Sequence, residues 1–182
     1  MAVYFTADTH FGHKNVLSNS NRPFCSVDLM NETIFRNWAE KLQPSDTIYH
    51  LGDVAFGNRE AVRGFAARIR ELPGTKFLVP GNHDWRYPGE LFAAFDKVLP
   101  PIYELTVSNY RLVLCHYPML DWNGRSRGTL QLFGHVHNTY YGNSQQANVG
   151  VDAFGFAPVR LEVVLARIRR FSDGGFSNAE AG

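Results

Sequence analysis

The segment 76–84, KFLVPGNHD, runs from a short apolar stretch into a turn that carries asparagine, histidine and aspartate. The stretch Lys76–Val79 predicts a β-strand, and the Pro-Gly pair after it predicts that the strand ends there. Turn formation explains the glycine and the asparagine of Gly81–Asp84, but not the His-Asp pair that follows them. Loops at strand ends are where rigid scaffolds carry functional groups. The segment therefore predicts a functional loop at the end of a strand.

The same arrangement, a strand-like stretch followed by metal-capable side chains, occurs at four other places. These are Asp8-Thr9-His10 after 2–7, Gly52-Asp53 after 47–51, His116 after 110–115, and Gly134-His135-Val136-His137 after 129–133. In extended backbone, residues i and i+2 face the same side. We therefore expect Asp8 with His10, and His135 with His137, each to present two ligands to one cavity.

The rest of the chain predicts alternating helices and strands. Apolar residues at three- and four-residue spacing predict one helix from Leu29 to Leu42, with Ser26 or Asp28 as its cap, and another after Asn58. Further strands are expected at 102–107, 110–115, 147–151 and 159–165. We expect one α/β domain (α+β layered) over residues 1–170, followed by a flexible Gly- and Ser-rich tail over residues 171–182.

Composition narrows the class of protein. Of 182 residues, 45% are hydrophobic and 19% charged, which excludes a disordered chain. The net charge of +1 gives no electrostatic footprint for non-specific nucleic-acid binding, so a nucleic-acid partner is possible but not favoured. Two cysteines, no signal-like N-terminus and no long apolar stretch predict a cytoplasmic protein without a membrane partner. The oligomeric state stays open.

The order of the five motifs, D-x-H, G-D, G-N-H-D, H and G-H-x-H, resembles the calcineurin-like metallophosphoesterase family. The likeness extends from Asp8 to His137 and is greatest to small bacterial and phage-type members. It implies a four-layer α/β/β/α sandwich, in which helices flank two central β-sheets.

The resemblance also implies the ligands of two divalent metal ions. One ion would be held by Asp8, His10, Asp53 and His137, and the other by Asp53, Asn82, His116 and His135, with the Asp53 carboxylate bridging the two. Imidazole, carboxylate and amide ligands without a thiolate suit Mn²⁺, Fe²⁺, Ni²⁺ or Zn²⁺. Mn²⁺ is the first choice by resemblance.

The implied activity is hydrolysis of a small phosphodiester or phosphomonoester, by attack of a metal-bridging hydroxide on phosphorus. His83 would protonate the leaving oxygen or stabilise the transition state, and Asp84 would orient His83. Two alternatives remain. One is a nuclease that uses the same site, and the other is a non-catalytic metal-binding interaction scaffold, like the retromer subunit of this superfamily.

Substrate contacts are expected from the segment after the first motif, where His13, Asn15 and Arg22 could reach a phosphate. The alternative is a solvated loop in which Arg22 pairs with a surface carboxylate. The stretch Pro118–Gly128 carries Trp122 and two arginines, which would either form a pocket wall or anchor the loop.

Overall fold

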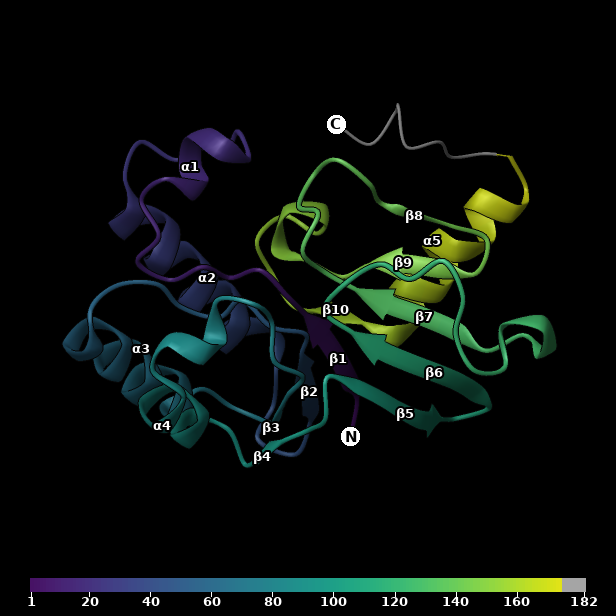
Figure 1. Ribbon diagram of the computed structural model, residues 1–182, viewed down its shortest axis with the longest axis horizontal. Helices are drawn as coiled ribbons and strands as arrows, with labels where there is room; N and C mark the ends of the chain where they lie inside the picture. The colour runs from purple at the N-terminus through teal and green to yellow at the C-terminus, as the bar shows by residue number, and fades with distance from the viewer. Residues whose placement is uncertain (175–182) are drawn as a thin grey trace.

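The computed structural model describes residues 1–174, which form two five-stranded β-sheets with helices packed around them (Figure 1). The first sheet has the strand order β10-β1-β2-β3-β4, and the second has the order β5-β6-β7-β9-β8. This confirms the mixed α/β architecture with two sheets that the motif order implied. Residues 175–182 of the expected tail lie outside the described residues.

In the first sheet, four strands run parallel and one edge strand runs antiparallel. The strands are β1 (Val3–Thr6), β2 (Thr47–His50), β3 (Thr75–Leu78), β4 (Lys97–Val98) and the antiparallel β10 (Val159–Arg160). The register places Phe5 opposite Tyr49 and Tyr49 opposite Phe77, and these rings stack across the sheet. Cross-strand aromatic pairs of this kind stabilise the pairing of neighbouring strands.

The second sheet is mixed. An antiparallel hairpin, β5 (Ile102–Val107) and β6 (Tyr110–Cys115), is followed by β7 (Leu130–Phe133) and β9 (Gln146–Asn148) in parallel, with β8 (Gly142–Asn143) antiparallel at the edge. The hairpin has the predicted bounds. The second strand of the hairpin, β6, runs parallel to its neighbour β7, so the carboxyl ends of β6 and β7 lie at the same edge of the sheet.

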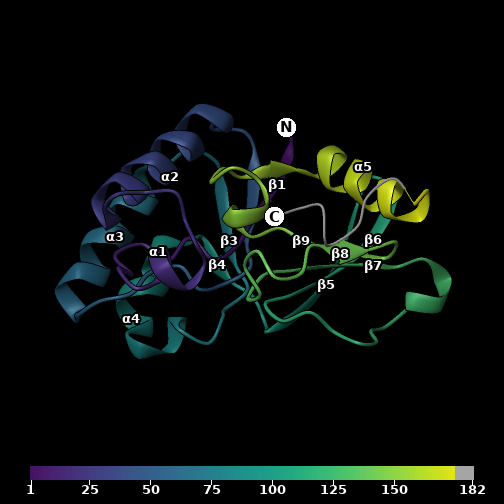
Figure 2. The ribbon, with the colours of Figure 1, turned by 90° about the horizontal axis from the view of Figure 1, so that it is seen from above.

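Helices α2 (Val27–Lys41) and α3 (Arg59–Glu71) form a layer on the outer side of the first sheet (Figure 2). Both predicted caps are present, because Ser26 and Asn58 accept hydrogen bonds from the backbone N–H of Leu29 and Ala61. The shorter helices are α1 (Val16–Asn19), α4 (Pro88–Leu91), η1 (Asp84–Arg86), η2 (Phe92–Ala94), η3 (Arg125–Arg127) and η4 (Val151–Ala153).

The alternation of side chains in the first sheet separates two hydrophobic cores. Ile48 and Leu78 face the layer of α2 and α3, whereas Phe5 and Leu51 face the second sheet. The helix α5 (Leu161–Ser172) adds its buried face to the core between the sheets and contacts strands of both. Within residues 1–174, no helix combines the length and the apolar character that crossing a membrane requires.

The strand expected at 159–165 is wrong beyond its first two residues. The buried residues of this segment follow the i, i+3, i+4 and i+7 spacing of a helix: Leu161, Val164, Leu165 and Ile168. Burial of this helical face outweighs the β-propensity of Val163 and Val164. The same helix includes Phe171 and Ser172, which the sequence placed in the tail.

His50, at the end of β2, is buried in a chain of hydrogen bonds. Its Nδ1 accepts from the Gly52 N–H, its Nε2 lies 3.0 Å from Thr9 Oγ1, and that hydroxyl donates to the Val54 carbonyl. Burial lowers the pKa of His50 from 6.5 to about 3. His50 is therefore a core residue whose ring connects the segment after β1 to the loop after β2.

His50 makes the stability of the protein depend on pH. The folded chain keeps this imidazole neutral down to about pH 3, whereas an unfolded chain protonates it near 6.5, so its contribution to stability is complete above pH 6.5 and is lost as the pH falls. We expect the parent to lose about 2 kcal/mol more unfolding free energy than His50→Gln between pH 7.5 and pH 5. Urea unfolding at a series of pH values, with chelator present, measures the difference. Parallel pH curves for the two proteins would contradict this assignment.

Candidate metal centre

The predicted ligands lie where three neighbouring parallel strands of the first sheet and two of the second sheet end. Asp8 follows β1, Asp53 follows β2 and Asn82 follows β3, while His116 follows β6 and His135 follows β7. Carboxyl ends of parallel strands share one edge of a sheet, which is where open α/β folds bind ligands. Because the two sheets pack together, side chains from five strand ends reach one place.

The backbone at five of the seven candidate ligands is left-handed rather than extended. Asp8, His10, Asp53, His135 and His137 have φ between 49° and 72°, a region that side chains other than glycine rarely adopt. The extended backbone that we assumed for these pairs is therefore wrong. Asp8 and His10 nevertheless fall in one group of possible ligands, and His135 and His137 line the same cavity. Residues in strained conformations persist only where surrounding contacts hold them, and they gather at functional sites.

Two glycines of the motifs are required by close approach. A Cβ at Gly81 would collide with the carboxylate and backbone of Asp53, and a Cβ at Gly134 would collide with Ala7 and the Asp8 carboxylate. The glycines therefore allow loops from different strands to lie against the two carboxylates.

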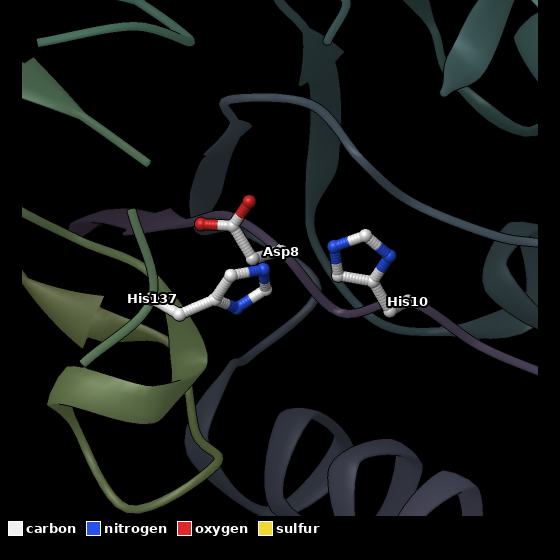
Figure 3. A group of neighbouring side chains, drawn as sticks. All are labelled: Asp8, His10 and His137. Carbon is white, nitrogen blue, oxygen red and sulfur yellow. The ribbon is translucent and has the colours of Figure 1, made fainter. Parts of the chain in front are cut away.

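The first group of possible ligands consists of Asp8, His10 and His137, whose donor atoms lie within 4.8 Å of one another. Figure 3 shows Asp8 and His10 on one segment and His137 reaching the same space from another. His10 Nδ1 lies 3.1 Å from His13 Nδ1, whereas His10 Nε2 is buried without a hydrogen-bond partner. A buried nitrogen without a partner is costly, and a metal ion is a partner that an imidazole accepts. The residues of this group therefore fit a divalent ion.

The second group consists of Asp53, His116 and His135, again within 4.8 Å. The Nδ1 of His116 lies 2.7 Å from the Leu51 carbonyl, to which it donates, so Nε2 is the ring nitrogen that a metal ion would bind in place of a proton. Asn82 Oδ1 is 3.2 Å from this Nε2. The arrangement places one carboxylate, two imidazoles and one amide oxygen together, which is a donor set that suits borderline divalent metals.

Asp53 connects the two groups. Its Oδ2 lies 3.6 Å from His10 Nε2 and 3.5 Å from His116 Nε2, while its Oδ1 accepts the backbone N–H of His83. A carboxylate in this position has an oxygen that faces ligands of both groups.

The unusual pKa values in the cluster have physical causes. Burial raises the pKa of Asp8 to about 6, against the opposing charges of His116 and His137. For Asp53, burial is outweighed by the hydrogen bond and charge of His116, and the pKa falls below its usual range. The same pairing, against burial, raises the pKa of His116 to about 9, whereas burial lowers that of His10. Perturbed groups gathered in one cavity are typical of functional sites.

His83 lies at the mouth of the cluster, with its side chain 37% exposed and its Nε2 3.8 Å from Asp53 Oδ2. Its ring meets Phe56 edge-on at 5.7 Å between centroids. His83 belongs to neither group of possible ligands, as the resemblance implied.

Asp84 does not hydrogen-bond to the His83 ring, which it was predicted to orient, but binds backbone N–H groups. Its buried carboxylate accepts the backbone N–H groups of Asp53, Val54 and Gly81 at 2.8–2.9 Å, so it joins the loops after β2 and β3. The hydrogen bonds of this carboxylate all come from backbone N–H groups, and none comes from the His83 ring. Burial raises the pKa of Asp84 to about 6, even though these N–H groups favour the ionised form.

The open cavity above the cluster has a volume of about 230 Å³. Of the predicted substrate contacts, His13 lines it, with its ring stacked on Phe56 at 4.3 Å. Asn15 is exposed at the start of α1 and is not among the lining residues. Val16 and Asn19 of α1 and Ser20 at its C-terminal end, which the sequence did not single out, line the cavity instead.

Arg22 is placed differently from the prediction that it contacts substrate. Its guanidinium is buried and hydrogen-bonds to Asp152 and to backbone carbonyls. Asp152 was not singled out in the sequence, and its only signal is that it follows a strand as the other motif residues do. Burial alone would raise the pKa of Asp152, but its hydrogen bonds to His137 and Arg22 outweigh that effect and keep the pKa below its usual value.

The stretch Pro118–Gly128 does not line the cavity. Trp122 is buried, donates from Nε1 to the Thr129 carbonyl and carries the Arg125 guanidinium over its ring, so it anchors the loop. Tyr117, in contrast, lies beside the second group, with its ring edge-on to His135 and its hydroxyl 3.3 Å from Asn82 Oδ1.

Comparisons with known proteins agree with this geometry. The chain is 28% identical to "Uncharacterized protein MJ1445" of Methanocaldococcus jannaschii, over 92% of each chain. It is 25% identical to the "Gene 66 protein" of Mycobacterium phage L5, over 88% of this chain and 91% of the phage protein. The solved structure of the protein of unknown function AQ665 from Aquifex aeolicus superimposes with a TM-score of 0.74 at 26% identity, over 90% of this chain and 97% of that one.

The family comparison is more specific. Residues 1–151, which include every predicted metal ligand, match the model of the calcineurin-like phosphoesterase superfamily domain. That match spans most of the chain, and the protein therefore belongs to the calcineurin-like phosphoesterase superfamily.

Proposed function

We propose that the protein is a dinuclear metal-dependent phosphoesterase that hydrolyses a small phosphodiester, with a phosphomonoester as the alternative substrate. The observation that carries the proposal is the position of Asp53 Oδ2, which is nearly equidistant from His10 Nε2 and His116 Nε2, at 3.6 and 3.5 Å. One carboxylate thereby serves two groups of ligands. Two-metal phosphoesterases require such a shared ligand to keep their ions a few ångströms apart.

Each residue has a role in this proposal. Asp8, His10 and His137 would hold one ion, and Asn82, His116 and His135 the other, with Asp53 shared by both. Divalent ions in such a site, here Mn²⁺ as the first choice and Fe²⁺, Ni²⁺ or Zn²⁺ as the alternatives, would supply the acidity that activates water and the positive charge that stabilises a phosphoryl transition state. The charges of the two ions would exceed those of Asp8 and Asp53, so the cavity would attract an anion.

His83 is placed to act on the leaving group. Its backbone N–H is fixed on Asp53 Oδ1, while its ring is partly exposed and packed on Phe56. A ring held at one edge of the cavity can donate a proton to the leaving oxygen, or a hydrogen bond to the phosphoryl group, without leaving its position.

The size of the cavity favours a small substrate. A volume of about 230 Å³ is below the roughly 300 Å³ at which pockets for drug-sized ligands begin. It accommodates a phosphoryl group and part of one ester group, and the rest of the substrate would extend into solvent. The net charge of +1 offers no general attraction for nucleic acid, so we do not propose a nuclease. Nuclease activity is instead one of the results that the assay below can give.

The proposal predicts that chelator-stripped protein is inactive and that Mn²⁺ restores hydrolysis, with saturation at about two ions per chain. The measurement is release of 4-nitrophenol from bis(4-nitrophenyl) phosphate and from 4-nitrophenyl phosphate during a Mn²⁺ titration. The ratio of the two rates assigns diester or monoester preference, and parallel assays on single-stranded and duplex nucleic acid test the nuclease.

Two results would contradict the proposal. Two bound ions without turnover of any ester would indicate the metal-binding interaction scaffold. Failure to bind two ions would remove the basis of the assignment altogether.

A further inference from the structure

A buried ion pair lies directly behind the first group of ligands. Arg22 donates from Nε to Asp152 Oδ1 and from Nη2 to Asp152 Oδ2, both at 2.8 Å. The two side chains are 0% and 4% exposed, and the residues are 130 positions apart. Bidentate pairs of this kind fix both side chains in one geometry.

This pair touches both segments that carry the first group. Asp152 Oδ2 lies 2.9 Å from His137 Nδ1, on the segment after β7. Arg22 donates from Nη2 to the Asp8 carbonyl at 2.6 Å and from Nη1 to the Thr9 carbonyl at 3.2 Å, on the segment after β1. The Arg22 guanidinium thus holds the left-handed backbone at Asp8, and the same group also holds Asp152, the hydrogen-bond partner of His137.

The contacts determine which nitrogen of His137 carries a proton. A carboxylate paired with arginine only accepts hydrogen bonds, so His137 Nδ1 must donate to Asp152. Arg22 Nη2 is also 3.5 Å from this nitrogen, at the outer limit of hydrogen bonding. The contact to Asp152 is shorter, at 2.9 Å, and we therefore assign the hydrogen bond of Nδ1 to Asp152. His137 Nε2 is then left with the lone pair, as a metal ligand requires.

Asp152 is itself fixed by backbone contacts to the first strand. Ala7 and Gly150 form a parallel bridge, and the Val151 N–H donates to the Ala7 carbonyl at 3.0 Å. The helical turn η4 then places Asp152 beneath His137. Asp152 lies one residue beyond the region that the family model matches, so the match itself does not include it.

We propose that Arg22 and Asp152 are positioning residues, which hold His137 in its ligand tautomer and fix the Asp8–His10 segment against it. The inference rests on the proposed metal centre, but its tests read metal binding and ring protonation rather than activity. Stability alone gives little reason for the pair, because a buried ion pair contributes little over an apolar replacement of the same volume.

The first test compares Asp152→Asn with Asp46→Asn. Asp46 is the matched control, since it is also a buried carboxylate that accepts hydrogen bonds, from the Ala2 and Gln43 N–H groups, at the opposite end of the first sheet. In calorimetric Mn²⁺ titrations of chelator-stripped protein, we expect Asp152→Asn to weaken one of two binding steps about 10- to 100-fold. Asp46→Asn should bind as the parent does. Parent-like binding by Asp152→Asn, or equal weakening in both variants, would overturn the proposal.

The second test needs no variant to fold. Nitrogen-15 NMR of the metal-free parent, recorded at a pH at which the His137 ring carries a single proton, reports which nitrogen bears it, and we expect Nδ1. A resonance pattern with the proton on Nε2 would overturn the proposal. Failure of the proposed function gives a different result, because a parent that binds metal and shows this tautomer but hydrolyses no ester would leave the positioning role intact.

Discussion

Asp53→Asn is expected to abolish binding of both metal ions and to lower phosphoester hydrolysis about a thousandfold or more. Asp53 Oδ2 faces His10 and His116 at 3.6 and 3.5 Å, so the substitution removes an anionic ligand from both groups at once. It also leaves His116, whose pKa Asp53 helps to raise to about 9, with a weaker counter-charge. Without a ligand shared by both ions, the site would lose the water activation and the charge stabilisation that two metal ions supply, which is the reason for the large expected loss.

The measurement is the metal content of purified Asp53→Asn, together with its kcat/KM on the better of the two chromogenic esters. Asp46→Asn again serves as the control, because it makes the same chemical change to a buried carboxylate far from the cavity. If Asp53→Asn retained one ion at parental affinity, Asp53 would belong to a single site and would not bridge.

The sequence was sufficient for the parts of this protein that depend on local pattern. Apolar periods located α2 and α3 together with their caps, and the hairpin of β5 and β6 was placed residue for residue. The candidate ligands could be found because each follows a strand, and parallel strands bring their ends together whatever the details of the loops. Topology thus carries residues that are distant in sequence to one site.

The sequence was insufficient where tertiary contacts decide. Nothing local marks Asp8 or His137 as left-handed, because that conformation is imposed by packing around them. The partner of Arg22 is 130 residues away, so a buried arginine and a substrate-binding one look the same in the sequence. Asp84, beside a histidine, suggested an acid–base pair, but three backbone N–H groups compete for its two oxygens and take both.

His83→Ala is expected to lower turnover by about two or more orders of magnitude, the usual scale for a lost acid–base group, while the metal content stays that of the parent. The metal should remain because His83 belongs to neither group of ligands. Its only hydrogen bond to Asp53 comes from the backbone N–H, which alanine keeps. If the variant also lost metal, His83 would be a ligand and the assigned role would be wrong.

The choice of ester separates the two roles that remain open for His83. A 4-nitrophenolate leaving group needs little protonation, whereas an alkoxide needs a proton as its bond to phosphorus breaks. If His83 is the general acid, His83→Ala should therefore lose much more activity on an alkyl ester than on the 4-nitrophenyl ester. If His83 stabilises charge on the phosphoryl oxygens, both esters should lose the same factor. The partly exposed ring at the rim of the cavity can reach either atom, so this ratio decides between the two roles.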